Sequence, residues 1–209
     1  MSKDIVATLL TDDGWNDAAA EAYQRAVRGV LLKFADWNWT RGKEAEPIEK
    51  GTQLVATGTA AAWVKWAGGK PVETRLRQPG TPMAEREDLG DSDQEQWELG
   101  PDKKPRDPWA NTRFVYLISP DTAEAFTFST SSWGGREAVI NLGDSIARMR
   151  SAHPNAMPIV ALEAAPMPTK FGRKSKPIFK IIGWKALGSK APELPQPTLK
   201  EDLQDGCPF

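Results

Sequence analysis

One helical segment set among β-like runs is the feature of this sequence that most restricts its fold. Residues 136–152 place apolar side chains at the spacing of one helix face. The runs around it are rich in β-branched and aromatic residues, as strands are, and they cover residues 30–34, 52–66, 70–78, 112–119, 124–132, 157–166 and 176–186. Turn sequences at 68–69 (Gly-Gly) and 120–122 (Pro-Asp-Thr) join neighbouring runs as hairpins. The pattern predicts a mainly β domain with one helix before its last two strands.

This order of elements matches the OB-fold, a five-stranded Greek-key barrel, with the helix between strands 3 and 4. Two additions to that barrel are expected: an Ala-rich N-terminal helix at 12–28 and a long, exposed, acidic insertion at 79–108. A basic loop at 167–175 is expected between the last two strands. We take residues 1–188 as one OB-fold-like domain and 189–209 as a disordered Pro-rich linker with an acidic tip.

Composition argues against most kinds of catalysis. The 209 residues include one His and one Cys, His153 and Cys207, whereas a zinc site needs about four N or S ligands. Nucleophilic dyads and triads have the same two residues to draw on. We therefore expect a protein that is not an enzyme and has no metal or cofactor. No apolar run has the roughly 20 residues that span a bilayer, and no signal peptide is recognisable, so a cytoplasmic protein without membrane contact is expected.

The net charge of −1 hides an uneven distribution. Residues 81–107 hold nine acids against four bases, and the tail from 191 holds four acids against one base. Residues 164–190 hold seven bases and no acid. A basic body with two acidic appendages is typical of a protein that binds a polyanion.

Aromatic and basic residues recur together in the strands and loops, which is the mixture that holds single-stranded nucleic acid through base stacking and phosphate contacts. The strongest local signal is TKFGRKSK at 169–176. The candidate nucleic-acid-binding residues are Trp63, Trp66, Arg75, Arg77, Trp133, Lys170, Phe171, Arg173, Lys174, Lys176, Trp184 and Lys185. For Trp63 and Trp184 a place in the core is the alternative interpretation. Five other aromatics lie inside apolar runs and are expected in the core: Phe114, Tyr116, Phe126, Phe128 and Phe179. Residues 131–137 could hold a phosphate on helix N–H groups, but an ordinary N-cap is the stronger interpretation.

The chain ends in KEDLQDGCPF, an acidic segment with one aromatic residue at its end. Such a segment can dock on a partner, with the ring in an apolar pocket and the terminal carboxylate held by Arg or Lys. Asp202, Asp205, Pro208 and Phe209 are the candidate partner-binding residues. The same acids could compete with nucleic acid for the basic body, because the tether gives them a high effective concentration.

This ending resembles the C-terminal tip of bacterial single-stranded DNA-binding proteins, in which Asp residues lead to Ile-Pro-Phe; here Gly206 and Cys207 replace the last acid and the Ile. The body is similar to phage-encoded single-stranded DNA-binding proteins in the blocks DPWANTRFVYLISP, FSTSSWGGREAV and KFGRKSKPIFKIIGW. The resemblance implies an OB-fold that coats single-stranded DNA in the bacterial host during phage DNA replication or recombination. It also implies that the tip recruits replication or recombination proteins, and it leaves a homodimer open. Two alternatives remain: a protein-interaction or virion component built on the same barrel, and a magnesium-dependent nuclease that uses the insertion carboxylates.

Overall fold

The computed structural model describes residues 25–169 and 172–186, and in them it is mainly β with one α-helix. The strands are β1 (Val30–Ala35), β2 (Asn38–Arg41), β3 (Glu46–Ile48), β4 (Gln53–Ala67), β5 (Lys70–Leu76), β6 (Trp109–Ile118), β7 (Ala125–Thr130), β8 (Ala156–Thr169) and β9 (Gly172–Ala186). The helix is α3 (Trp133–Met149), and two short 3₁₀ turns, η1 (Glu87–Leu89) and η2 (Gln94–Gln96), lie between β5 and β6. Within these described ranges, no helix is both long and apolar enough to cross a membrane.

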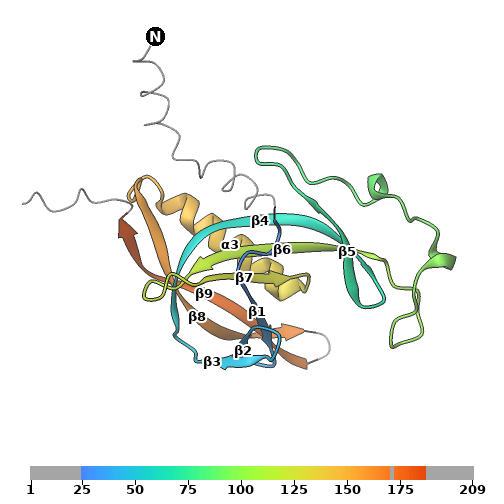
Figure 1. Ribbon diagram of the computed structural model, residues 1–209, viewed down its shortest axis with the longest axis horizontal. Helices are drawn as coiled ribbons and strands as arrows, with labels where there is room; N and C mark the ends of the chain where they lie inside the picture. Colours follow the sequence, from blue (N-terminus) through green and yellow to red (C-terminus); the bar gives the residue numbers. More distant parts are fainter. Residues whose placement is uncertain (1–24, 170–171, 187–209) are drawn as a thin grey trace, which may run out of the picture.

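All nine strands belong to one sheet, in the order β3-β2-β1-β7-β6-β4-β8-β9, with β5 paired to β4. β6 and β7 are antiparallel neighbours, and β6 and β8 both pair with the long strand β4. β8 and β9 form a second long hairpin, and β1 pairs with β7 in parallel. The sheet curls into an open half-barrel with α3 along it and the insertion beside β5 (Figure 1). The expectation of a mainly β domain with one helix before its last two strands is confirmed in these residues.

Several details differ from the sequence-based expectation. The sheet has nine strands and not five, because β1, β2 and β3 extend it beyond β7 and β5 extends it beyond β4. β3 lies between the expected strands at 30–34 and 52–66, where the sequence pattern predicts no strand. The expected basic loop at 167–175 is mostly strand, since β8 continues to Thr169 and β9 begins at Gly172. The helix expected at 12–28 falls largely outside the described residues, and its last four residues, 25–28, are not helical. The linker and tip at 189–209 lie wholly outside them.

Aromatic residues build the main core between the sheet and α3. Trp39 is 1% exposed, and its ring centroid lies 5.3 Å from that of Phe128 and 5.5 Å from that of Phe179. These tilted and edge-to-face contacts add to the burial of large apolar surface. The Trp39 Nε1–H donates to the Glu163 carbonyl at 3.0 Å, so the buried indole keeps a hydrogen bond. All five aromatics that the sequence assigned to the core are buried.

The helix covers only part of this face. Ala138, Val139 and Leu142 of α3 pack in the same cluster as Val115 and Leu117 of β6. Successive residues of a strand alternate between its two faces. Asn111 and Arg113, which precede Val115 and Leu117 in steps of two, therefore lie on the same face of β6. The opposite face carries a smaller cluster of its own, including Phe114 and Tyr116.

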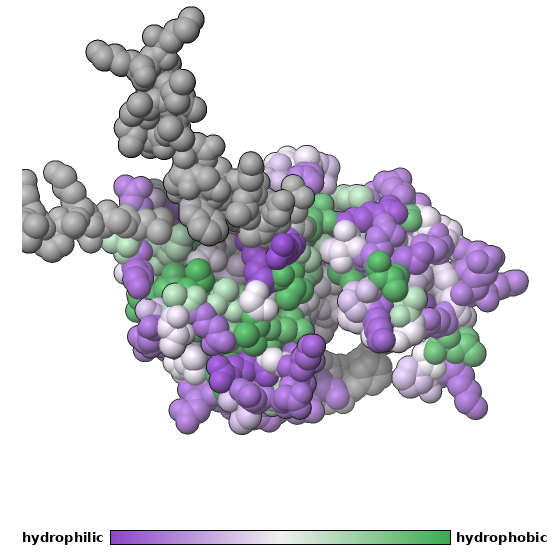
Figure 2. Space-filling model, viewed as in Figure 1, coloured by the Kyte–Doolittle hydropathy of each residue, from purple (hydrophilic) through white to green (hydrophobic). Residues whose placement is uncertain are grey.

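The acidic insertion is hydrogen-bonded to the sheet around Asp91. Its carboxylate accepts from Lys65 Nζ at 2.9 Å and from Trp109 Nε1 at 2.8 Å, and its backbone carbonyl accepts from Trp97 Nε1 at 2.8 Å. The hydrogen bonds from Lys65 and Trp109 lower the pKa of the Asp91 carboxyl. Hydrophilic side chains predominate on the right of Figure 2, where β5 and the insertion lie, with a few hydrophobic ones among them; larger hydrophobic patches reach the surface over the body of the sheet.

Arg86 makes the second attachment. Its guanidinium forms a two-bond pair with Asp107, with Nε to Oδ2 at 2.7 Å and Nη2 to Oδ1 at 2.8 Å. It also donates to the carbonyls of Gly90 and Asp91 at 2.7 and 3.2 Å. Burial raises the pKa of the Asp107 carboxyl, but the hydrogen bonds from Arg86 and from the Trp109 N–H outweigh burial, and the net pKa is lowered. We call these contacts of Asp91 and Arg86 the insertion latch.

Candidate nucleic-acid interface

A hollow of about 400 Å³ lies where the β1–β2 turn, the start of α3 and the β8–β9 hairpin meet. We call it the tryptophan groove after its two indoles; its lining includes Trp37, Trp133, Arg173 and Lys174. Trp133 is 64% exposed and Trp37 is 38% exposed. Asp36 is the one carboxylate among the described lining residues. Two accessible indoles beside two cations provide stacking surfaces and phosphate partners in one place.

Trp37 reaches the groove from a turn with unusual backbone geometry. Asp36 and Trp37 join β1 to β2, and their φ angles are +47° and +71°. A two-residue hairpin favours left-handed residues, but normally Asn, Asp or Gly, and a left-handed residue with a side chain costs roughly 1–2 kcal/mol. The Trp37 N–H donates to Ser175 Oγ of β9 at 3.1 Å, which ties the turn to the hairpin. A bulky residue kept where glycine fits more easily supports a functional role for this indole.

Trp133 is presented by the first turn of α3. Ser132 caps the helix, with its Oγ accepting from the Gly135 N–H at 3.2 Å, so the N-cap interpretation of residues 131–137 is confirmed. Gly134 and Gly135, which follow Trp133, let the helix start close to its neighbours. A Cβ on Gly134 would lie 2.9 Å from Met167 Sδ, and a Cβ on Gly135 would clash with Thr130 Oγ1. This close approach holds Trp133 beside the β8–β9 hairpin.

A second hollow, of about 240 Å³, shares Trp133 with the groove. We call it the arginine cleft; its lining residues are Asn111, Arg113, Trp133, Arg136, Glu137 and Ile140. Arg113 of β6 stands opposite Ala61 of β4. Arg77, directly after β5, lies at the other edge of β4, where its N–H donates to the Ala61 carbonyl at 2.8 Å. Directly opposite residues share a face of a sheet, so Arg77 and Arg113 flank the small side chain of Ala61.

The electrostatics of the cleft are dominated by like charges. Burial, followed by the positive charges of Arg77 and Arg136, lowers the pKa of the Arg113 guanidinium. Arg136 lies in the first turn of α3, which contains no acid, and a helix N-terminus is itself a partial positive charge. Glu137 is the carboxylate in the lining, and it is paired with Lys176 at 3.0 Å. The cleft is therefore electropositive.

Two polar atoms of the cleft are buried without a hydrogen-bond partner in the described residues: Arg113 Nε and Asn111 Oδ1. One is a donor and the other an acceptor. Buried polar atoms in native proteins are nearly always paired, so among the described residues the cleft carries one unmet donor and one unmet acceptor.

Other candidates from the sequence are engaged within the fold. The Trp63 Nε1–H donates to the Ala84 carbonyl of the insertion at 2.8 Å. Arg75 pairs with Glu73 at 2.7 Å and lies over the Trp109 ring, 4.8 Å from its centroid. Lys176 pairs with Glu137 of α3, so its charge is offset by an acid far away in the sequence. Their role in nucleic-acid binding stays a prediction.

The remaining candidates lie apart from the groove. Trp184 and Lys185 lie at the opposite end of β9 from Arg173, and at roughly 3.3 Å per residue about 35 Å of strand separates them. Trp184 stacks on His153, with ring centroids 4.4 Å apart. Trp66 is 43% exposed near the tip of the β4–β5 hairpin. Lys170, Phe171 and the four tip residues Asp202, Asp205, Pro208 and Phe209 lie outside the described residues.

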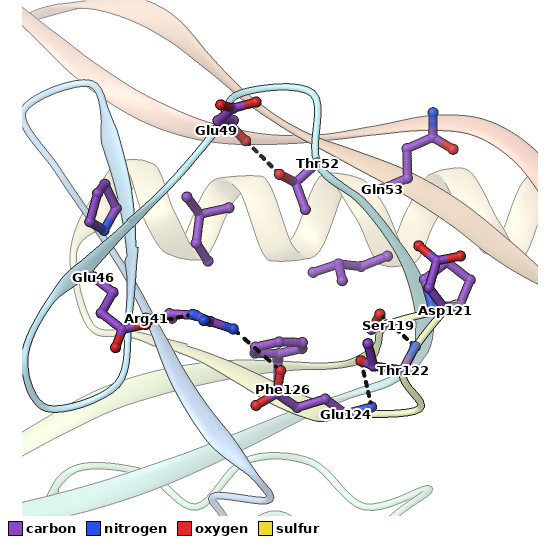
Figure 3. A pocket seen from close by; sticks show the side chains of 14 residues that line it. Arg41, Glu46, Glu49, Thr52, Gln53, Ser119, Asp121, Thr122, Glu124 and Phe126 are labelled. Carbon is purple, nitrogen blue, oxygen red and sulfur yellow. Dashed lines mark hydrogen bonds and ion pairs between the residues drawn. The ribbon is translucent and has the colours of Figure 1, made fainter.

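A hollow of about 630 Å³ beside the β6–β7 turn and the connection between β3 and β4 is unsuited to a polyanion. Its lining includes the carboxylates of Glu46, Glu49, Asp121 and Glu124. The cation among them, Arg41, is held between Glu46 at 2.9 Å and Glu124 at 3.4 Å (Figure 3). The hollow is acidic, so phosphate binding is favoured at the groove and cleft instead. Among the described residues, no group of three or more His, Cys, Asp or Glu is arranged to hold a metal ion.

Comparison with known proteins gave no support for any family: no protein-family model matches the chain, and no curated protein or solved structure matches it significantly. The interpretation of the site therefore rests on its geometry.

Sequence reasoning missed Trp37, Asn111, Arg113 and Arg136. Two of them carry a signal that could have been used. Arg113 occupies an inward position in the alternation of β6, where Val115 and Leu117 are core residues. Arg136 places a cation in a first helical turn, where the macrodipole favours acids. Both break a local rule, as functional residues often do.

Proposed function

We propose that this chain binds single-stranded DNA without sequence preference, through the tryptophan groove and the adjoining arginine cleft. The observation that carries the proposal is the meeting of Trp37, Trp133 and the cations Arg173 and Lys174 in one hollow. These residues come from three elements that are far apart in the sequence. Every base has a face that can stack on an indole, and each stack contributes roughly 1–3 kcal/mol. Cations beside the indoles hold phosphates without reading sequence.

An OB-fold interpretation of the sheet supports the same proposal. If β4, β6, β7, β8 and β9 are the five barrel strands, α3 lies between the third and fourth, and each antiparallel pairing of an OB barrel is present. β1 then occupies the seam beside β7. In OB-folds, oligonucleotides bind at the loops that join strands 1 to 2 and 4 to 5. Those positions are taken here by the insertion and by the β8–β9 hairpin that carries Arg173 and Lys174.

The wider role follows from the resemblance to phage-encoded single-stranded DNA-binding proteins. The protein coats single strands in the cytoplasm of the bacterial host during phage DNA replication or recombination. Its tip, through Asp202, Asp205, Pro208 and Phe209, recruits partner enzymes. The chain itself catalyses no reaction and acts as a monomer or a homodimer.

A fluorescence anisotropy titration with labelled oligo-dT tests the proposal. Trp133→Ala is expected to weaken binding about 5- to 150-fold, the loss of one stacked base. Lys174→Ala is expected to weaken binding and to flatten the slope of log affinity against log salt by about 0.7, the value for one phosphate contact on a single strand.

Lys33→Ala is the matched control. Lys33 is exposed on β1, and its neighbour Phe34 lines the groove. Because successive strand residues alternate between faces, the Lys33 side chain lies on the face away from the groove. Absence of wild-type binding at low salt would refute the proposal and favour a protein-interaction or virion component. Cleavage of the oligonucleotide with magnesium would favour the nuclease.

A further inference from the structure

We infer that the arginine cleft is a nucleotide subsite in which Arg113 holds one phosphodiester of the bound strand and Asn111 accepts a hydrogen bond from a nucleobase N–H. The inference rests on the proposed function and adds a defined contact to it. It concerns residues that line one hollow with Trp133.

The first argument is the uncompensated charge of the cleft. The charges that act on Arg113 are those of Arg77 and Arg136, and both are positive. Among the described lining residues the one carboxylate, on Glu137, is already paired with Lys176. Burying a charge without a partner opposes folding, so an anion in this place would remove a cost that the free protein carries.

The second argument is the pair of unpartnered atoms. Arg113 Nε needs an acceptor and Asn111 Oδ1 needs a donor, and the two residues lie two positions apart on β6, on the same face. A sulfate ion alone would supply only acceptors. A nucleotide supplies both, since its phosphodiester oxygens accept and its base carries N–H groups.

The third argument is continuity. Trp133 lines both the cleft and the tryptophan groove. A strand whose base stacks on the Trp133 ring therefore passes from one hollow to the other, and a neighbouring nucleotide enters the cleft.

The test separates a ligand-binding arginine from a structural one by measuring stability and binding together. Arg113→Met keeps an unbranched apolar stem but removes the guanidinium and its charge. We expect the melting temperature of the free protein to rise by about 2–4 °C, because an unpaired, partly buried charge is gone. We expect the affinity for oligo-dT to fall about tenfold or more. Arg148→Met, an exposed position near the end of α3, should change neither quantity.

A strand of abasic deoxynucleotides separates the two contacts. Asn111→Ala should weaken binding of oligo-dT several-fold and leave binding of the abasic strand unchanged, whereas Arg113→Met should weaken both. If Asn111→Ala weakened binding of oligo-dT and of the abasic strand equally, the contact between Asn111 and a base would be refuted.

The outcomes also distinguish this inference from the proposed function. If wild type binds, Trp133→Ala weakens binding and Arg113→Met binds as wild type does, the subsite is refuted and the groove stands. If wild type binds no oligonucleotide, both are refuted. Should Arg113→Met fail to fold, Arg136→Gln on the surface of α3 provides the same binding test, and an unchanged affinity there would count against the cleft.

Discussion

Replacing Arg86 by alanine should open the acidic insertion without unfolding the sheet. Arg86 makes four hydrogen bonds, two to the Asp107 carboxylate and two to backbone carbonyls. Hydrogen bonds to charged groups contribute about 1.5–3 kcal/mol each when well buried. Here the side chains of Arg86 and Asp107 are 20% and 35% exposed, so solvent screening reduces the contribution. We take about 2 kcal/mol as the contribution of the four Arg86 hydrogen bonds together to keeping the insertion closed.

Hydrogen exchange of individual amides measures this quantity. The Gly100 N–H donates to the Lys104 carbonyl at 2.8 Å inside the insertion, so it is protected while the insertion stays closed. A loss of about 2 kcal/mol in local opening free energy predicts roughly 30-fold faster exchange. The amide of Val115, in the core strand β6, should exchange as in wild type.

Arg106→Ala is the control, because Arg106 is an exposed arginine of the same insertion for which no side-chain bond is found within the described chain. Equal exchange of the Gly100 amide in wild type, Arg86→Ala and Arg106→Ala would refute the insertion latch. A general increase that included Val115 would show that Arg86 supports the whole sheet.

Two further predictions concern pH and the start of α3. The pKa values of Asp91 and Asp107 are lowered in the folded protein. The two carboxylates therefore stabilise the closed insertion fully above the ordinary carboxyl pKa of 3.8. This stabilisation is lost as the pH falls through their lower pKa values in the folded protein. Protection of insertion amides, corrected for intrinsic exchange, should therefore be constant from about pH 5 to 8 and fall below about pH 4; a loss near pH 6 would contradict this assignment. Gly135→Ala should destabilise the fold by about 1–3 kcal/mol in urea denaturation, because its Cβ meets Thr130 Oγ1. Gly143→Ala, in the same helix with open space around it, should stabilise by about 0.5–1 kcal/mol, and similar effects of both substitutions would argue against close packing at the helix start.

The strands, the hairpins and much of the core could be predicted from the sequence because they depend on near neighbours. A Gly-Gly turn needs only its own two residues to be left-handed, and both are, with φ angles of +56° and +73°. Phe126 and Phe128 alternate with polar residues within one strand, so their burial follows from a period of two. Local chemistry also predicted the N-cap of α3.

The extent of the sheet could not be predicted in this way. β3 has only three residues and contains Pro47, so it has no local strand pattern, and it exists because β2 offers it an edge. The basic segment after Met167 was expected to be a loop because charge runs usually are. It is strand because β8 and β9 pair with each other residue by residue up to Thr169 and Gly172.

What the sequence by itself determined is the class of fold and the presence of cations and indoles in excess of what a core needs. Which of them act together was decided by the tertiary structure. Trp37 and Trp39 look alike in the sequence, yet the hairpin turn sends one to the surface and the other into the core. Lys176 forms an ion pair with Glu137 on the helix, whereas no ion pair of Arg113 or Arg136 is found among the described residues. The physical reason is that sheet register and helix docking set the distances between charges, and no local pattern carries that information.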